Sequence, residues 1–154
     1  MSKTLRYRLF KVGAVPESVR DQLSREQILF FDEGIAVTIR RRGTAPGFSG
    51  SATGKFSGAL AITDRGIVAT VSNTTMIDAA YGAQIVDEKA AILSLKEDGL
   101  HAKIDASVNA RCTGEIEMHF RVELTDQQLD QFPQRELKFN FPPDLVPKIF
   151  GVPG

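Results

Sequence analysis

A run of three arginines is the densest group of chemically active side chains in the chain. With the lysine that opens the next predicted strand, the group consists of Arg40, Arg41, Arg42 and Lys55. Between them lies a Gly- and Ser-rich stretch, which we expect to form a loop over residues 43–54. Guanidinium groups form paired hydrogen bonds with phosphate oxygens, and glycines let backbone amides approach an anion. The group is therefore a candidate site for an anion or anionic lipid; the alternative is a solvated strand end beside a mobile loop.

Histidine and cysteine give weaker signals of chemistry. The two histidines, His101 and His119, fall on the polar faces of predicted strands, and the only cysteine is Cys112. This set lacks the spacing of zinc ligands, and one cysteine cannot form an internal disulfide. The sequence has no G-x-S-x-G nucleophile elbow and no P-loop. We therefore predict no catalytic residue, no metal site and no cofactor, and expect that the protein is not an enzyme.

Apolar residues gather between prolines near the end of the chain. An extended apolar segment must cover something: its own domain, a second subunit, or the groove of a partner. Packing on its own domain is the simplest of the three. With the phenylalanine at the centre of the expected loop, the candidate partner-binding residues are Phe48, Phe139, Phe141 and Phe150.

Size and charge restrict the class of protein. A chain of 154 residues is the size of one domain, so we predict a single domain over residues 1–154. Lys plus Arg number 19 and Asp plus Glu number 19, and this balance argues against a dedicated nucleic-acid binder. The first fifteen residues lack the apolar core of a signal peptide, and no stretch reaches the ~20 apolar residues that span a bilayer. We therefore expect a cytoplasmic protein.

The clearest strand lies over residues 114–124. Apolar residues at even positions, from Ile116 to Leu124, alternate with charged residues and His119 at odd positions. Strict alternation buries one face and leaves the other in water, which is typical of an antiparallel sheet. The acidic residues and His119 on the polar face are expected to be its solvated side; the alternative is a polar cleft.

A short helix is predicted directly after this strand, over residues 125–132. Thr125 and Gln128 match a capping box, and Leu124 and Leu129 match the hydrophobic staple that accompanies it. Pro133 ends the helix.

The other predicted elements are shorter. A helix is expected over residues 16–23, and Leu5 to Leu9 and Leu137 to Phe141 alternate like two further short strands. Four prolines after residue 141 predict a tail without regular structure. The main strands are expected at 34–41, 54–62, 66–72, 75–81, 90–96, 100–106 and 114–124. Asp98-Gly99 predicts a hairpin turn between the strands at 90–96 and 100–106.

Part of the chain resembles a known superfold. The segment from Phe56 to Thr70 is similar to the hairpin "G-x-L-x-(I/L)-T-(D/N)-x-R-(I/L)" of GRAM-type and bacterial pleckstrin-homology-like (PH-like) domains, except that Arg65 comes one place early and Gly66 takes its position. The resemblance implies an all-β fold with short helices: a partly open antiparallel barrel of about seven strands with a C-terminal capping helix, its core at about 34–133. Residues 1–33 and 134–154 would then be packed extensions.

The resemblance also bears on function. PH-like domains bind phosphoinositides, peptides or proteins, and basic residues near the first loop hold the lipid in those that bind one. The leading expectation is a non-catalytic binding or scaffolding module that contacts a protein partner, or a second copy of itself. Peripheral binding of anionic lipid through the basic first loop is the second hypothesis. A small-ligand carrier or enzyme that uses the barrel interior is the third.

Overall fold

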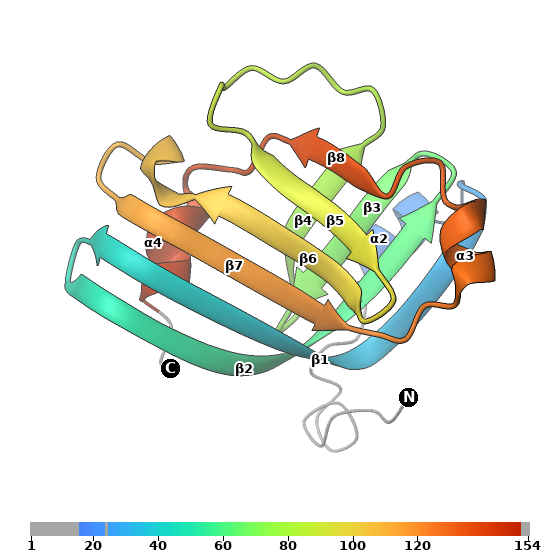
Figure 1. The fold of residues 1–154 in the computed structure, drawn as a ribbon, viewed down its shortest axis with the longest axis horizontal. Coiled ribbons are helices and arrows are strands. Elements are labelled where there is room, and N and C mark those ends of the chain that lie inside the picture. Colours follow the sequence, from blue (N-terminus) through green and yellow to red (C-terminus); the bar gives the residue numbers. More distant parts are fainter. Residues whose placement is uncertain (1–15, 24, 152–154) are drawn as a thin grey trace.

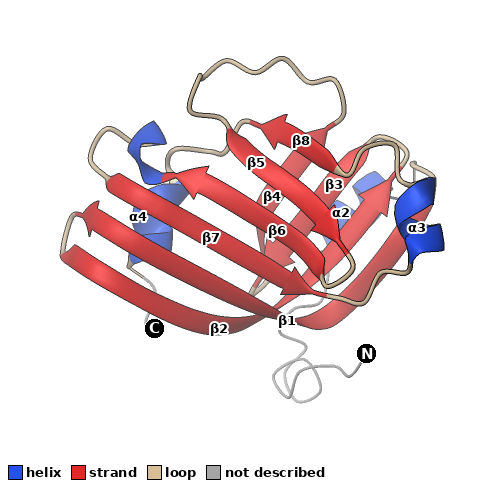
Figure 2. Cartoon of the chain, viewed as in Figure 1, coloured by secondary structure: helices blue, strands red, loops and turns tan. Residues whose placement is uncertain are grey.

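The computed structural model describes residues 16–23 and 25–151, and over these residues the chain forms one strongly curved antiparallel sheet with short helices (Figures 1 and 2). The strand order is β4-β3-β2-β1-β7-β6-β5-β8. The strands are β1 (Ile28–Ala45), β2 (Phe48–Thr63), β3 (Gly66–Val71), β4 (Thr74–Ala80), β5 (Ala91–Lys96), β6 (Gly99–Asp105), β7 (Thr113–Arg121) and β8 (Glu136–Phe139). The helices are α2 (Glu17–Leu23), the 3-10 turn η1 (Ala106–Val108), α3 (Asp126–Gln131) and α4 (Leu145–Phe150). The prediction of an all-β fold with short helices is confirmed.

The long strand β1 makes the sheet curl. It pairs with β2 along its whole length and with β7 from Val37 to Thr44, so one strand belongs to both halves of the sheet. Register shifts near Ile28 and near Glu33 mark bulges, and Gly34 has a φ of 70° there. Bulges bend a strand and increase its twist. The two edge strands, β4 and β8, consequently come back into contact, and the sheet is nearly closed into a barrel.

The core fills the inside of this barrel. Each strand contributes alternate side chains, as the period-two pattern predicted, and Leu60, Leu93, Ile116 and Phe120 are fully buried. Helices α3 and α4 pack into the same core from opposite ends of the barrel (Figure 1). The predicted capping box at Thr125 is present.

Helix α2 covers the outside of β2 and β3. Its Val19 and Leu23 pack on Ala59, Ala61 and Val68, in a second buried cluster on the far side of the sheet from the core. The small residues that alternate with large ones in β2 therefore have a role, because they let a helix lie close to the sheet. We name this surface, made by Ala59, Ala61 and Val68, the covered face.

Two predictions about irregular structure are wrong. The loop expected over residues 43–54 is strand on both sides of a two-residue turn, since β1 continues to Ala45 and β2 starts at Phe48. The tail, expected to lack regular structure, contains α4 with Pro147 at its third residue. A proline there is tolerated because the first turn of a helix has no intrahelical acceptors for its N–H groups.

Other expectations have mixed outcomes. The short strand predicted at Leu137 to Phe141 is confirmed as β8, whereas the one at Leu5 to Leu9 lies outside the described residues. No helix in the described part of the chain is long and apolar enough to cross a membrane. The relationship to PH-like or GRAM-type domains stays a prediction.

Candidate functional site

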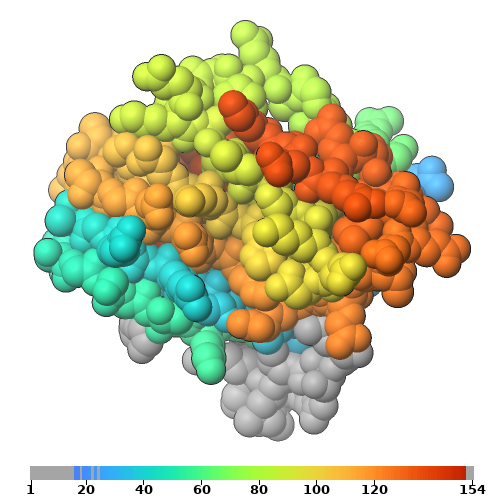
Figure 3. All heavy atoms as spheres, in the orientation of Figure 1, coloured from blue at the N-terminus to red at the C-terminus, as the bar shows by residue number. Residues whose placement is uncertain are grey.

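A shallow depression of about 430 Å³ lies on the outside of the barrel, across β5, β6, β7 and β1. This surface is turned toward the viewer in Figures 1 and 3. We name it the open face, because no described helix covers it as α2 covers β2 and β3. Among the described residues that line the depression, four are basic and one is acidic. The charged and imidazole side chains of the lining are Arg40, Lys96, His101, Lys103, Glu117, His119 and Arg121.

Strand register places these side chains together. His101 of β6 lies directly opposite His119 of β7, and Lys103 lies opposite Glu117, which in turn lies opposite Arg40 of β1. Each of these residues has a buried neighbour in its own strand. Because successive side chains of a strand point to opposite faces, the side chains of these residues point outward, away from the core. The polar side of the alternating pattern thus forms a continuous surface over four strands.

The turn between β5 and β6 brings a carboxylate to the histidine pair. Lys96 pairs with Gly99, so only Glu97 and Asp98 form the connection. Gly99 has a φ of 124°, and a Cβ there would lie 2.0 Å from the carbonyl oxygen of Phe120. Glycine is therefore required where the hairpin leaves its turn, and Asp98 is held against the outer face beside β7.

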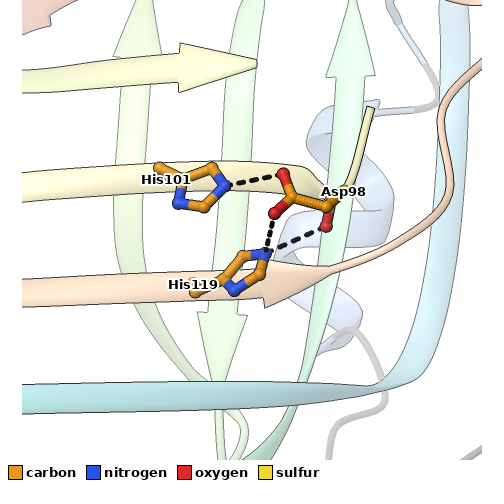
Figure 4. Close-up of side chains that lie close together, drawn as sticks. All are labelled: Asp98, His101 and His119. Atoms are coloured by element: carbon orange, nitrogen blue, oxygen red, sulfur yellow. Dashed lines mark hydrogen bonds and ion pairs between the residues drawn. The ribbon is translucent and has the colours of Figure 1, made fainter. Parts of the chain in front are cut away.

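Asp98, His101 and His119 form a compact cluster (Figure 4). The Nε2 atom of His101 lies 2.8 Å from Asp98 Oδ1, and His119 Nε2 donates to the Asp98 backbone oxygen at 2.9 Å. The second carboxylate oxygen, Oδ2, is 3.6 Å from His119 Nε2. The two rings are stacked, with centroids 4.1 Å apart and planes 17° from parallel. Both Nε2 atoms consequently point to one carboxylate.

Burial and hydrogen bonding alter the acid–base properties of the cluster. Desolvation lowers the pKa of His119 from its ordinary value, and this outweighs the hydrogen bond to the Asp98 backbone. The hydrogen bond with His101 is the largest cause of the lowered pKa of Asp98. A neutral imidazole beside an ionised carboxylate can accept a hydrogen bond, bind a cation or exchange a proton.

The four basic residues predicted as an anion site are split between two environments. The exposed residues on the outside of the sheet are Arg40, Arg42 and Lys55. On the neighbouring strand β7, Glu117 lies opposite Arg40 and Glu115 lies opposite Arg42. Arg41 points into the barrel, is 3% exposed, and has its guanidinium 5.9 Å from the centre of the Phe48 ring. Successive side chains in a strand point to opposite faces of the sheet, so the three arginines do not form one group.

The predicted partner-binding phenylalanines lie in or against the core. Phe139, Phe141 and Phe150 are buried, and Phe48 is half-buried with its ring 5.1 Å from that of Phe150. The tail therefore packs on its own domain, which is the first of the three possibilities given for it above. In this conformation none of the four offers an open apolar surface to a partner.

A smaller apolar cavity of about 250 Å³ lies between α4 and strands β1 to β4. Arg41 and Lys148 border it, together with aliphatic and aromatic side chains such as Phe56, Met76 and Ile149. Cys112 is buried in the core.

The Asp98 cluster was missed by sequence reasoning although each part of it had a signal. Asp98-Gly99 was predicted as a hairpin turn, and both histidines were assigned to polar strand faces. The register between β6 and β7 was not available from the sequence. The two strands are joined by the seven residues 106–112, which include η1, and such a connection sets the register less predictably than a two-residue turn. Counting back from a tight turn fixes a register, but an irregular connection does not.

Comparison of the chain with protein-family models, with curated proteins and with solved structures finds no match.

Proposed function

We propose that the protein is a non-catalytic binding module whose open face recognises an acidic segment of a partner protein. The observation that supports this most is the excess of basic side chains in the depression: Arg40, Lys96, Lys103 and Arg121 against Glu117 among the described lining residues. Complementary charge steers association and selects partners. The proposal keeps protein recognition from the sequence analysis and moves it from the four candidate phenylalanines to the open face.

The shape of the surface favours a chain segment over a small enclosed ligand. The charged lining residues are mostly exposed, and the depression extends over four strands rather than entering the barrel. Ile92 is 38% exposed within it, so one apolar anchor stands among the cations. Interfaces commonly combine a few apolar anchors with a charged surround.

Anionic lipid is less well supported as the ligand. Two of the four basic residues predicted for it, Arg40 and Arg42, lie opposite Glu117 and Glu115. A membrane that contacts these arginines would also meet the carboxylates of the two glutamates. Arg41 points into the barrel and is not available for such a contact.

Fluorescence anisotropy with two peptides tests the proposal. One peptide is rich in Glu and Leu, and the other has Gln in place of every Glu. We expect the acidic peptide to bind and the Gln peptide not to bind, with affinity falling as salt rises because exposed charges are screened. The double variant K96E/K103E should weaken binding by about tenfold or more, since repulsion replaces attraction at two positions.

A charge-matched control separates the open face from net charge. The variant R65E/K148E changes the net charge by the same amount at exposed positions that do not line the depression. It should bind the acidic peptide like the parent. Equal loss in both variants, or binding only to vesicles of anionic lipid and not to the peptide, would show that the proposed recognition is wrong.

A further inference from the structure

The cluster of Asp98, His101 and His119 has the composition of a transition-metal site. Two imidazole nitrogens and one carboxylate oxygen suit zinc and its neighbours, whereas magnesium and calcium prefer oxygen ligands alone. One ligand atom from each of the three residues lies within 4.8 Å of the other two. The three residues come from β6, β7 and the turn before β6, so the arrangement depends on the fold.

The distances are close to those that a bound cation needs. Bonds of about 2.1 Å in tetrahedral geometry place ligand atoms roughly 3.4 Å apart. The separations between Asp98 oxygens and the histidines are 2.8 Å and 3.6 Å, on either side of that value. All separations among the three ligand atoms are within 4.8 Å, so rotation of the side chains needs to shorten only the longer of them to place the three atoms around one centre.

The orientation of the rings points to the same place. Both Nε2 atoms are directed at Asp98, and the stacked rings hold them on one side (Figure 4). A cation at this position would replace the proton that His119 now donates to the Asp98 backbone and the one shared between His101 and the carboxylate. Each neutral ring would then carry its proton on Nδ1, so no net loss of protons from the imidazoles is required.

The surroundings allow entry of an ion. Asp98 is exposed and both histidines are half-buried, so solvent reaches the cluster directly. Rigid strands carry both histidines, and adjacent strands fix their separation. Arg121 and Lys96, which line the same depression, oppose a cation electrostatically, so we expect moderate affinity and not that of a closed structural site.

We propose that Asp98, His101 and His119 bind one divalent transition-metal ion of the zinc type on the open face. Three protein ligands leave at least one position for water or an external ligand. This site is independent of the recognition of an acidic segment, which is tested with metal removed by a chelator.

Calorimetry with zinc on the full chain, without an affinity tag, tests the site. The sequence contains only these two histidines, so imidazole-dependent binding can come from nowhere else. We expect one zinc ion per chain, and a loss of affinity of at least about tenfold in each of H101Q, H119Q and D98N. The matched control D78N removes an exposed carboxylate on β4, away from the cluster, and should bind zinc like the parent.

A second measurement separates loss of the site from loss of the fold. Circular dichroism of the metal-free variants should match that of the parent, because the three substitutions lie at the surface. In proton NMR of the parent, zinc should shift the C2–H signals of both histidines together. Absence of zinc binding, equal binding by all variants, or a response from only one histidine would overturn the proposal.

Discussion

The covered face and the open face are two outer surfaces of one sheet, and they differ in composition. On β2 and β3 the outward residues Ala59, Ala61 and Val68 are small or apolar and lie under α2. On β6 and β7 the outward residues include Lys103 and His119, which line an open depression. The comparison shows that, among the described elements, a helix seals one outer surface of the sheet and none covers the other.

The largest expected effect is on the covered face. The substitution Ala61→Arg places a long charged side chain under α2, where Ala61 is 2% exposed. We expect unfolding free energy to fall by more than about 3 kcal/mol, because a buried charge without a partner is among the most damaging changes. Urea unfolding measures the loss.

The matched change on the open face is Lys103→Gln. It removes a charge at an exposed position without placing a like charge opposite Glu117, and it should alter unfolding free energy by only about 0.5 kcal/mol or less. Similar losses for the two variants would mean that α2 does not seal its surface, and the comparison between the faces would fail.

A smaller but still large effect concerns the backbone beneath the open face. Gly114 has a φ of 103°, and a Cβ there would lie 1.9 Å from the Arg42 carbonyl oxygen. We expect Gly114→Ala to reduce unfolding free energy by roughly 2–4 kcal/mol, through strain and separation of β1 from β7.

Gly47 provides the control for this backbone effect. Its φ is also positive, at 79°, but a Cβ there would meet nothing within 4 Å. Gly47→Ala should therefore cost about 1 kcal/mol, the price of the left-handed conformation alone. Equal losses at the two glycines in thermal unfolding would show that close contact of β1 and β7 is not what restricts Gly114.

The smallest expected effect is a dependence of stability on pH at the open face. The pKa of His119 is lowered from 6.5 by burial, so protonation favours the unfolded chain. Well above pH 6.5 His119 is neutral in both the folded and the unfolded chain, and stability does not depend on its titration. As pH falls through 6.5 toward the lower pKa of His119 in the folded state, stability decreases. Asp98 acts in a separate window, because its lowered pKa gives stability that is lost only at pH below 3.8.

Unfolding of the parent and of H119Q at about pH 7.5 and about pH 5 tests the histidine effect. The parent should lose more stability than H119Q between the two conditions. The same loss in both proteins would mean that desolvation of His119 is not significant in the folded state.

The regular part of the fold was predictable from the sequence because alternation and turn residues are local signals. The strand predicted over 100–106 and the hairpin at Asp98-Gly99 agree with β6 and its turn within a residue. The capping box at Thr125 is likewise a local pattern, and it forms as predicted.

What the sequence did not reveal depends on pairing between distant segments. Glycines over residues 43–54 predict a loop, whereas in the sheet Gly43 lies opposite Gly114 where β1 and β7 approach closely. The prolines of the tail predict an irregular segment, whereas α4 forms there and is stabilised by burial of Val146 and Ile149 in the core. The Asp98 cluster required the register of β6 on β7.

The most direct test of the central claim is a ¹⁵N–¹H NMR titration with the Glu-rich peptide. If the open face is the recognition surface, amide shifts will be concentrated in β5, β6, β7 and the adjoining part of β1, near Lys96 and Lys103, and Ala59 and Ala61 of the covered face will not respond. Shifts centred on the covered face or on α4, or no shifts at any peptide concentration, would contradict the account.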